Sequence, residues 1–195
     1  MSKLEIYTDG SCDNNSDTKN GAWAFVILDD GEVIVEKCGC ATRTTNNKME
    51  LEAINAALAE LPKNSVVTVH TDSQYCIGVL SKGWNATTNH DLIDVFCVIV
   101  GSNNIQVVFE WVKGHNGDTW NEYVNKLAYQ ELSILQAKTN KTQVDVDYKA
   151  VLTKLVDSID KIRVVKRMDA HHKSVEKAKR DYEKALKRAK EVINN

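Results

Sequence analysis

Three acidic side chains stand where strands and helices could bring them together. Asp9 ends the predicted strand "LEIYTD", Asp72 ends "SVVTVHTD", and Glu50 falls in the first turn of the predicted helix "NNKMELEAINAALAEL". If the two strands are parallel neighbours, both aspartates leave the same edge of the sheet, where ligand sites of open α/β sheets lie. Each acid alone also has an ordinary explanation, since a carboxylate in a first turn, for example, suits the helix dipole.

Carboxylates gathered in this way repel one another, so a cation is expected to hold them together. Ligands that are all oxygen, with no cysteine among them, favour Mg²⁺, with Mn²⁺ as a substitute. Two such ions about 4 Å apart can activate a water molecule and stabilise the leaving oxygen of a phosphodiester. The predicted chemistry is therefore metal-dependent phosphodiester hydrolysis.

The hydrophobic periodicity predicts an α/β fold with one mixed sheet flanked by helices. Strands are expected near residues 4–9, 22–28, 32–41, 65–72 and 105–112, and helices near 46–61, 73–80, 89–100 and 119–138. Asp29-Asp30-Gly31 is a hairpin signal between the second and third strands. The order is three strands that pair as hairpins, followed by alternating helices and strands.

Composition indicates a globular cytoplasmic protein. Of the 195 residues, 43% are hydrophobic and 27% charged, and no apolar run reaches the roughly 18 residues that a membrane span needs. Five cysteines, an odd number, favour reduced thiols in the cytosol. The N-terminus "MSKLEIYTDG" enters a strand at once, so no signal peptide is expected.

The charge is divided unevenly along the chain. Residues 149–195 hold 14 basic and 7 acidic side chains, whereas the rest of the chain is acidic. A basic tail indicates a nucleic-acid or other acidic partner, or a solvated lysine-rich helix face. Two apolar stripes with heptad-like spacing, out of register with each other, favour a helical hairpin over one long helix with a stutter. We predict a linker at 139–147 and a basic helical extension at 148–195.

Four sequence motifs occur in the order and spacing that are typical of a known family: "YTDGSC", "TRTTNNKMELEAINAAL", "HTDSQY" and "WVKGHNG…NEYVNKLA". Over residues 1–138 the chain resembles type 1 ribonuclease H, which cuts RNA in RNA–DNA hybrids. The resemblance implies a catalytic domain with the ribonuclease H-like fold, a five-stranded mixed sheet with helices on both sides. It further implies that Asp9, Glu50 and Asp72 bind two metal ions, with Asp9 bridging them, and that His115 shuttles a proton or aids product release.

Asn125 departs from that pattern. The family carries a fourth metal-binding Asp ten residues after the loop histidine, and that position is Asn125 here. An amide offers a carbonyl oxygen without charge, so the second ion is expected to bind weakly. The chain is either an engineered inactive variant, which we favour because the other motifs are intact, or a natural binder that has lost activity. Glu122, one helical turn earlier, is a weak substitute or a solvated residue.

The resemblance also assigns residues that contact an RNA–DNA hybrid. Short amides and main-chain groups suit 2′-hydroxyl recognition because they donate and accept hydrogen bonds. The assigned positions are Gly10, Ser11, Cys12, Asn15, Asn46, Asn47 and Gln74 for reading the hybrid, and Arg43, Thr45, Trp84 and Asn89 for the DNA strand. Asn46 and Asn47 could cap the following helix, either instead of reading the hybrid or in addition to it, and Trp84 could be a packed tryptophan.

The segment "SKGWNATTNHDL" lacks the basic protrusion that some relatives carry. The C-terminal helices could replace it as a nucleic-acid contact, or could mediate self-association. The leading expectation is an endonuclease for the RNA strand of hybrids. The alternatives are a non-catalytic hybrid-binding protein and the ribonuclease H module of a reverse transcriptase. The start at "MSKLEIYTDG" favours a free-standing protein over the latter.

Overall fold

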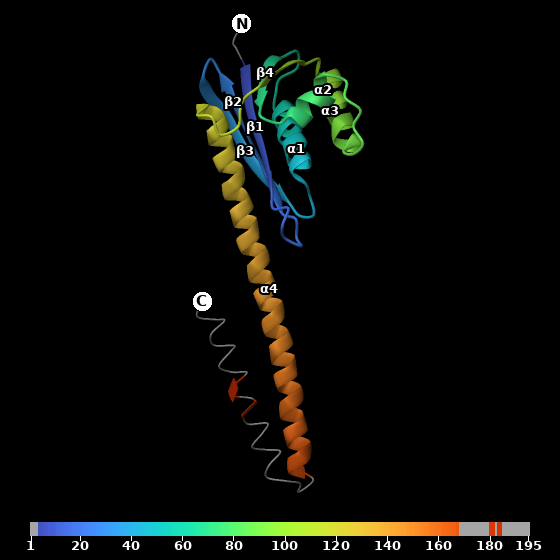
Figure 1. Ribbon diagram of the computed structural model, residues 1–195, viewed down its shortest axis with the longest axis vertical. Helices are drawn as coiled ribbons and strands as arrows, with labels where there is room; N and C mark the ends of the chain where they lie inside the picture. The colour runs from blue at the N-terminus through green and yellow to red at the C-terminus, as the bar shows by residue number, and fades with distance from the viewer. Residues whose placement is uncertain (1–3, 168–179, 182, 185–195) are drawn as a thin grey trace. The chain divides into compact units, whose positions relative to one another are not determined.

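The computed structural model describes residues 4–167, 180–181 and 183–184. Along the described chain, strands and helices follow one another in the predicted order. The elements are β1 (Leu4–Cys12), β2 (Gly21–Asp29), β3 (Glu32–Ala41), α1 (Asn46–Ala59), β4 (Val66–Thr71), α2 (Gln74–Ser81), α3 (His90–Asn103), β5 (Gln106–Trp111) and α4 (Thr119–Arg167) (Figure 1). None of the described helices is long and apolar enough to cross a membrane.

The strands form one mixed sheet in the order β3-β2-β1-β4-β5. β1 pairs antiparallel with β2, and β2 with β3, whereas β1, β4 and β5 are parallel. The predicted α/β fold, a five-stranded mixed sheet of the ribonuclease H type, is thus confirmed. Because β1 and β4 are parallel neighbours, the residues at their carboxyl ends reach the same edge of the sheet.

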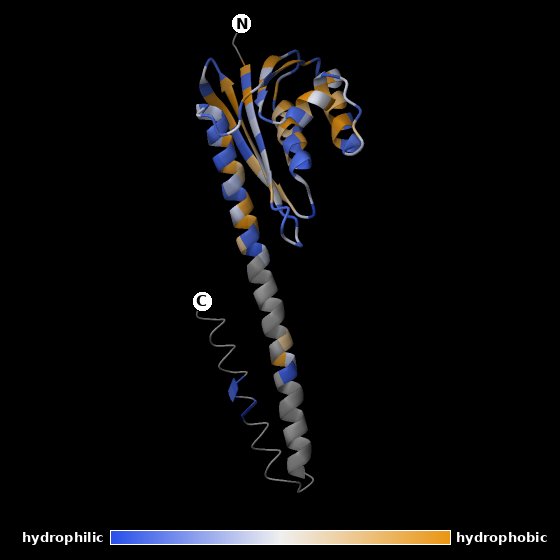
Figure 2. Ribbon diagram, viewed as in Figure 1, coloured by the Kyte–Doolittle hydropathy of each residue, from blue (hydrophilic) through white to orange (hydrophobic). Residues whose placement is uncertain are grey.

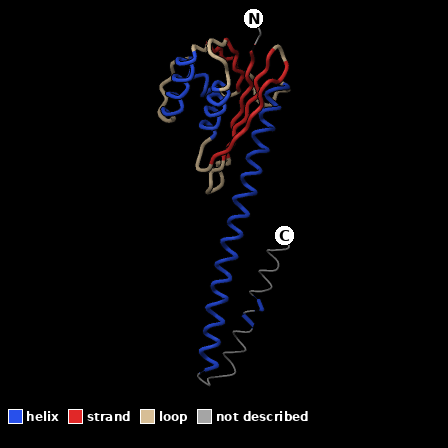
Figure 3. Tube along the Cα trace, turned by 180° about the vertical axis from the view of Figure 1, so that it is seen from behind, coloured by secondary structure: helices blue, strands red, loops and turns tan. Residues whose placement is uncertain are grey.

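Helices cover both faces of this sheet (Figure 3). α1, α2 and α3 pack on one face, around a buried cluster that includes Ile6, Phe25 and Ile54. The first part of α4 packs on the other face, where Val124 and Ala128 contact a cluster with Tyr7, Ala24, Val26 and Leu28. Figure 2 shows hydrophobic residues along the strands and helices of this core.

The chain divides into two compact units, Met1–Gln136 and Ala137–Asn195. The sequence predicts that the last helix of the body ends near Lys138, followed by a linker at 139–147. That end point is wrong, because α4 continues through these residues to Arg167. Gly and Pro are absent there, so nothing in the backbone chemistry forces a break. The predicted turn near residues 166–174 lies largely outside the described residues, so the helical hairpin stays a prediction.

Two smaller expectations about the acidic residues also change. β1 extends to Cys12, so Asp9 lies within the strand and does not end it. α1 begins at Asn46 behind the N-cap Thr45, and no acidic residue occupies its first turn. Glu50 therefore lies in the second turn, where burial against β1 rather than the helix dipole determines its environment.

Candidate metal and nucleic-acid site

Asp9, Glu50 and Asp72 converge in the folded chain. One carboxylate oxygen from each lies within 4.8 Å of the other two. Asp9 comes from β1, Glu50 from α1, and Asp72 directly follows β4. Asp9 and Glu50 are only 6% and 4% exposed, whereas Asp72 is half-buried. The structure thus brings together the three acidic residues that the sequence singled out.

Two glycines allow this convergence. A Cβ atom on Gly10 would overlap the main-chain nitrogen of Glu50 and would lie 2.6 Å from the carbonyl carbon of Met49. A Cβ atom on Gly114 would overlap Oδ2 of Asp72. Gly10 is therefore needed for β1 and α1 to approach, and Gly114 lets the loop after β5 pass beside Asp72. Sequence reasoning did not single out Gly114, although its place before His115 was a signal.

Burial disfavours ionisation of all three carboxyl groups, and neighbouring carboxylates add to this effect for Asp9 and Glu50. Burial, followed by the charge of Asp72, raises the pKa of Asp9 to about 7. Burial raises the pKa of Glu50 well above its ordinary value, and the charges of Asp9 and Asp72 add to this. Burial also raises the pKa of Asp72, while His115 lowers it. A bound cation would favour the ionised form of these buried carboxyl groups, so the site is suited to a cation.

The hydrogen bonding of Glu50 supports the same interpretation. Oε1 of Glu50 accepts a long hydrogen bond of 3.4 Å from Nδ2 of Asn46. Its other oxygen, Oε2, is buried and has no partner with hydrogen-bond geometry among the described residues, although the nearby main-chain N–H of Gly10 lowers the pKa of Glu50. A buried carboxylate oxygen without a partner is costly. A divalent cation bound by these oxygens would remove that cost, so the residues present fit a metal site.

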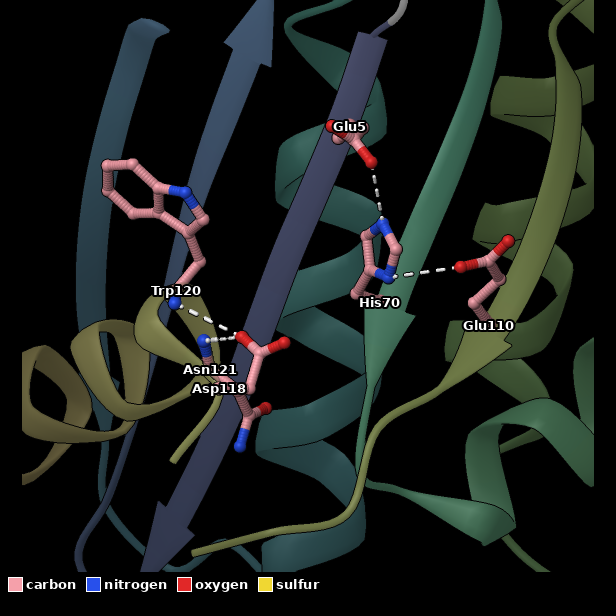
Figure 4. Close-up of polar contacts among 6 residues, drawn as sticks. All are labelled: Glu5, His70, Glu110, Asp118, Trp120 and Asn121. Carbon is pink, nitrogen blue, oxygen red and sulfur yellow. Dashed lines mark hydrogen bonds and ion pairs between the residues drawn. The ribbon is translucent and has the colours of Figure 1, made fainter. Parts of the chain in front are cut away.

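His115 lies in the loop that leads into α4. Its backbone adopts a left-handed conformation with φ of 53°. Its ring is close enough to the cluster to lower the pKa of both Asp9 and Asp72. The loop ends at Asp118, whose Oδ1 accepts hydrogen bonds of 3.1 Å and 2.9 Å from the main-chain nitrogens of Trp120 and Asn121 (Figure 4). Asp118 thereby fixes the start of α4.

Asn125 lies in α4 beside the stripe of Asn121, Val124 and Ala128, which pack against the sheet. Its side chain is half-buried, as the sequence predicted. Glu122 does not belong to the carboxylate cluster. Its Oε2 atom instead lies 3.9 Å from Nδ1 of His115.

The predicted hybrid-reading residues border the cluster in sequence and lie partly on exposed loops. Asn15, Arg43, Asn46 and Asn47 are exposed, whereas Ser11 and Cys12 are half-buried. The alternative that Asn46 or Asn47 caps α1 is wrong, because Oγ1 of Thr45 accepts the capping hydrogen bond from the nitrogen of Lys48 at 3.3 Å. The side-chain amides of Asn46 and Asn47 therefore do not make the N-cap hydrogen bond.

A pocket of about 320 Å³ brings two of the predicted contacts together, Gln74 and Trp84, with Ile77, Lys82 and Trp111. Trp84 is 54% exposed and Trp111 50%. Trp111 donates a hydrogen bond of 3.2 Å from Nε1 to the main-chain carbonyl of Asp72, so it connects the pocket to a residue of the carboxylate cluster. Sequence reasoning did not find Trp111. Asn89, the N-cap of α3, is not among these lining residues and donates a hydrogen bond of 3.1 Å to the hydroxyl of Tyr75.

A second polar group that the sequence did not reveal lies on the sheet itself. His70 on β4 contacts Glu5 on β1 at 3.3 Å through Nε2 and Glu110 on β5 at 3.5 Å through Nδ1 (Figure 4). Its ring stacks on that of Tyr7 with centroids 4.3 Å apart. Burial, followed by the charge of Asp118, raises the pKa of Tyr7 to about 12. These contacts tie together the three strands that position Asp9 and Asp72.

Comparison with known proteins gives a consistent result. The family model described as RNase H matches residues 1–133. A protein named Ribonuclease H from Albidiferax ferrireducens is 36% identical over 152 residues, which cover 70% of this chain and 99% of the relative. A Ribonuclease H from Novosphingobium aromaticivorans is 38% identical over 141 residues, covering 66% of this chain and 95% of the relative.

Proposed function

The chain belongs to the ribonuclease H family, and from this premise we propose that it is an endonuclease for the RNA strand of RNA–DNA hybrids. The family membership confirms the resemblance stated from the four sequence motifs. The observation that carries the proposal is the convergence of Asp9, Glu50 and Asp72 within 4.8 Å, in a site where one buried carboxylate oxygen has no partner among the described residues.

We further propose that Asp9, Glu50 and Asp72 hold Mg²⁺, with Mn²⁺ as a substitute, and that the amide oxygen of Asn125 is a fourth, uncharged ligand. Two such ions, when bound, activate water for attack on a phosphodiester and stabilise the leaving oxygen. The carboxylate set is all oxygen, which suits these hard cations. Hydrolysis of this kind gives products with 5′-phosphate and 3′-hydroxyl ends.

The remaining residues would select and orient the hybrid. The exposed amides of Asn15, Asn46, Asn47 and Gln74 can donate to and accept from the 2′-hydroxyls that distinguish RNA from DNA. Arg43 is exposed and offers a cation for a DNA phosphate. Trp84 is 54% exposed and would support the sugar–phosphate backbone of the DNA strand. His115 would move a proton to or from the reacting oxygens.

Asn125 reduces the negative charge available to the second ion, so this chain is expected to cleave slowly or not at all. The test is Asn125→Asp, with cleavage of the RNA strand of a hybrid measured in Mg²⁺ and duplex DNA as the substrate control. We expect cleavage to appear or to rise by at least roughly tenfold, because a charged ligand replaces a neutral one. Gln130→Glu is the matched control, since it adds the same charge to an exposed position of the same helix.

Asp9→Asn in the Asn125→Asp protein should abolish cleavage, because Asp9 would hold the metal together with Glu50 and Asp72. If Asn125→Asp gives no gain over the control, the chain is better explained as a non-catalytic hybrid-binding protein. A reverse-transcriptase module remains a third possibility, which a partner joined through the C-terminal helices would support. A cytoplasmic location and the division into a catalytic domain (1–138) and an extension (148–195) stay predictions, whereas residues 139–147, predicted as a linker, belong to α4.

A further inference from the structure

Glu122 is the acidic residue in the first turn of α4. Its Oε2 atom lies 3.9 Å from Nδ1 of His115, and both side chains reach solvent, with 43% of Glu122 and 78% of His115 exposed. In the described part of the chain, no other carboxylate lies within ion-pair distance of this ring. A contact between two partly exposed groups contributes little to stability, so its effect on the orientation of the ring is the more informative property.

The backbone on both sides of His115 makes defined contacts within the body, and the ring contacts Glu122. Gly114 lies against Oδ2 of Asp72, and Asp118 holds the start of α4 through two hydrogen bonds. His115 itself occupies the left-handed region with φ of 53°. The loop therefore places the imidazole at the edge of the carboxylate cluster. The orientation of the ring about its side-chain bonds depends on the residues that contact it.

We propose that Glu122 is a positioning residue for His115: its carboxylate accepts a hydrogen bond from the protonated Nδ1 and so leaves Nε2 directed toward the reacting phosphate. The inference rests on the proposed function, in which His115 moves a proton. The separation of 3.9 Å is longer than a hydrogen bond, so the proposal requires the two exposed side chains to move closer together. Hydrogen bonding at one ring nitrogen determines which tautomer the other presents, which makes the contact relevant to proton transfer.

The arrangement also gives Glu122 a role different from that of a metal ligand. Its carboxylate is not among the oxygens that lie within 4.8 Å of one another at the cluster. Glu122 and residue 125 are three positions apart in α4, so their side chains lie on neighbouring parts of one helix surface. The same helical turn thus carries the altered metal-ligand position and the group that orients the loop histidine.

The kinetic test uses the Asn125→Asp protein. We expect Glu122→Gln to lower kcat roughly 3- to 10-fold, the range of one hydrogen bond, and to leave KM for the hybrid unchanged. In a His115→Ala background the same substitution should have no further effect, because Glu122 acts through that ring. Glu131→Gln is the matched control, since Glu131 lies on the same helix and contacts Cys38. Equal decreases with and without His115, or a change confined to KM, would overturn the proposal.

A second measurement does not depend on cleavage. In the unaltered chain, the NMR signal of the His115 ring should shift on Glu122→Gln, whereas that of His70, held between Glu5 and Glu110, should not. An unmoved His115 signal would overturn the contact. If Asn125→Asp yields no cleavage but the signal moves, the proposed activity fails while the contact with Glu122 stands. The two failures are therefore distinguishable.

Discussion

The main-chain nitrogen of Glu50 lies so close to Gly10 that any Cβ atom at residue 10 would overlap it. The contacting atoms belong to the backbone of α1, which cannot move without displacing Glu50 from Asp9 and Asp72. The glycine in "YTDGSC" therefore sets the distance between strand and helix on which the carboxylate cluster depends.

We expect Gly10→Ala to destabilise the fold by about 1–3 kcal/mol, the usual effect of overpacking, and to abolish metal-dependent stabilisation. Gly101→Ala is the control: a Cβ atom there meets nothing within 4 Å, and alanine favours the interior of α3 by roughly 0.5–1 kcal/mol. Urea unfolding in the presence and absence of Mg²⁺ measures both effects. Equal stability of the two variants would show that β1 and α1 can separate freely.

Stability without metal should fall as the pH rises from about 4 to about 7. The pKa of Asp9 rises from 3.8 to about 7 on folding, and the pKa values of Glu50 and Asp72 rise too. The folded state therefore keeps protons that the unfolded chain has released. The contribution of these groups to stability is fully present below the unfolded pKa and is lost as the pH rises through the folded pKa.

This pH dependence can be measured by urea unfolding in EDTA at pH 5 and pH 8. Asp9→Asn should reduce the difference between the two values and should stabilise the metal-free protein at pH 8, because it removes one of the repelling charges. If the unaltered protein is as stable at pH 8 as at pH 5, the carboxylates are not as strongly coupled as their geometry indicates.

Divalent cations should reverse the destabilisation at pH 8. A ligand that binds only the folded state at 100 times its dissociation constant adds about 2.7 kcal/mol. We expect Mg²⁺ to raise the unfolding midpoint in a saturable way, and Asn125→Asp to shift this response to lower Mg²⁺ concentration. Asp72→Asn should weaken it. A response that survives the loss of Asp72 would place the bound ion elsewhere on the chain.

Much of this arrangement could be predicted from the sequence. The strands, their order and the convergence of Asp9 with Asp72 follow from short-range periodicity together with the rule that ligands bind at carboxyl ends of parallel strands. The prediction that Glu50 lies in the first turn of α1 is wrong, because Thr45, rather than Asn46 or Asn47, provides the N-cap. Caps are set by single hydrogen bonds, and three neighbouring polar residues can each supply one.

Other features depend on contacts between distant residues and leave no local pattern. His70 meets Glu5 and Glu110 only because β1, β4 and β5 align in one register. Trp111 reaches the carbonyl of Asp72 only because β5 ends beside β4. The continuation of α4 past Lys138 was missed for a different reason. A polar stretch such as "KTNKTQ" is compatible with a solvated helix as well as with a linker, and composition alone does not separate the two.

The last prediction concerns the basic C-terminal segment. Residues 149–195 carry 14 basic and 7 acidic side chains, and the body lacks the basic protrusion that some relatives have. Phosphate contacts strengthen binding without carrying sequence information. Removal of the chain after Lys138 should therefore weaken binding to hybrid, duplex RNA and duplex DNA alike, while the preference for hybrid, which depends on the body, stays the same.

Hybrid affinity across a salt series tests this directly. If the segment neutralises phosphates, the truncated protein should show a shallower slope of log K against log salt, by about 0.9 for each phosphate that the segment neutralises. An unchanged affinity and slope would exclude a role in substrate binding. A change from dimer to monomer in light scattering would then assign the apolar stripes to self-association, because an amphipathic helix needs a surface that covers its apolar face.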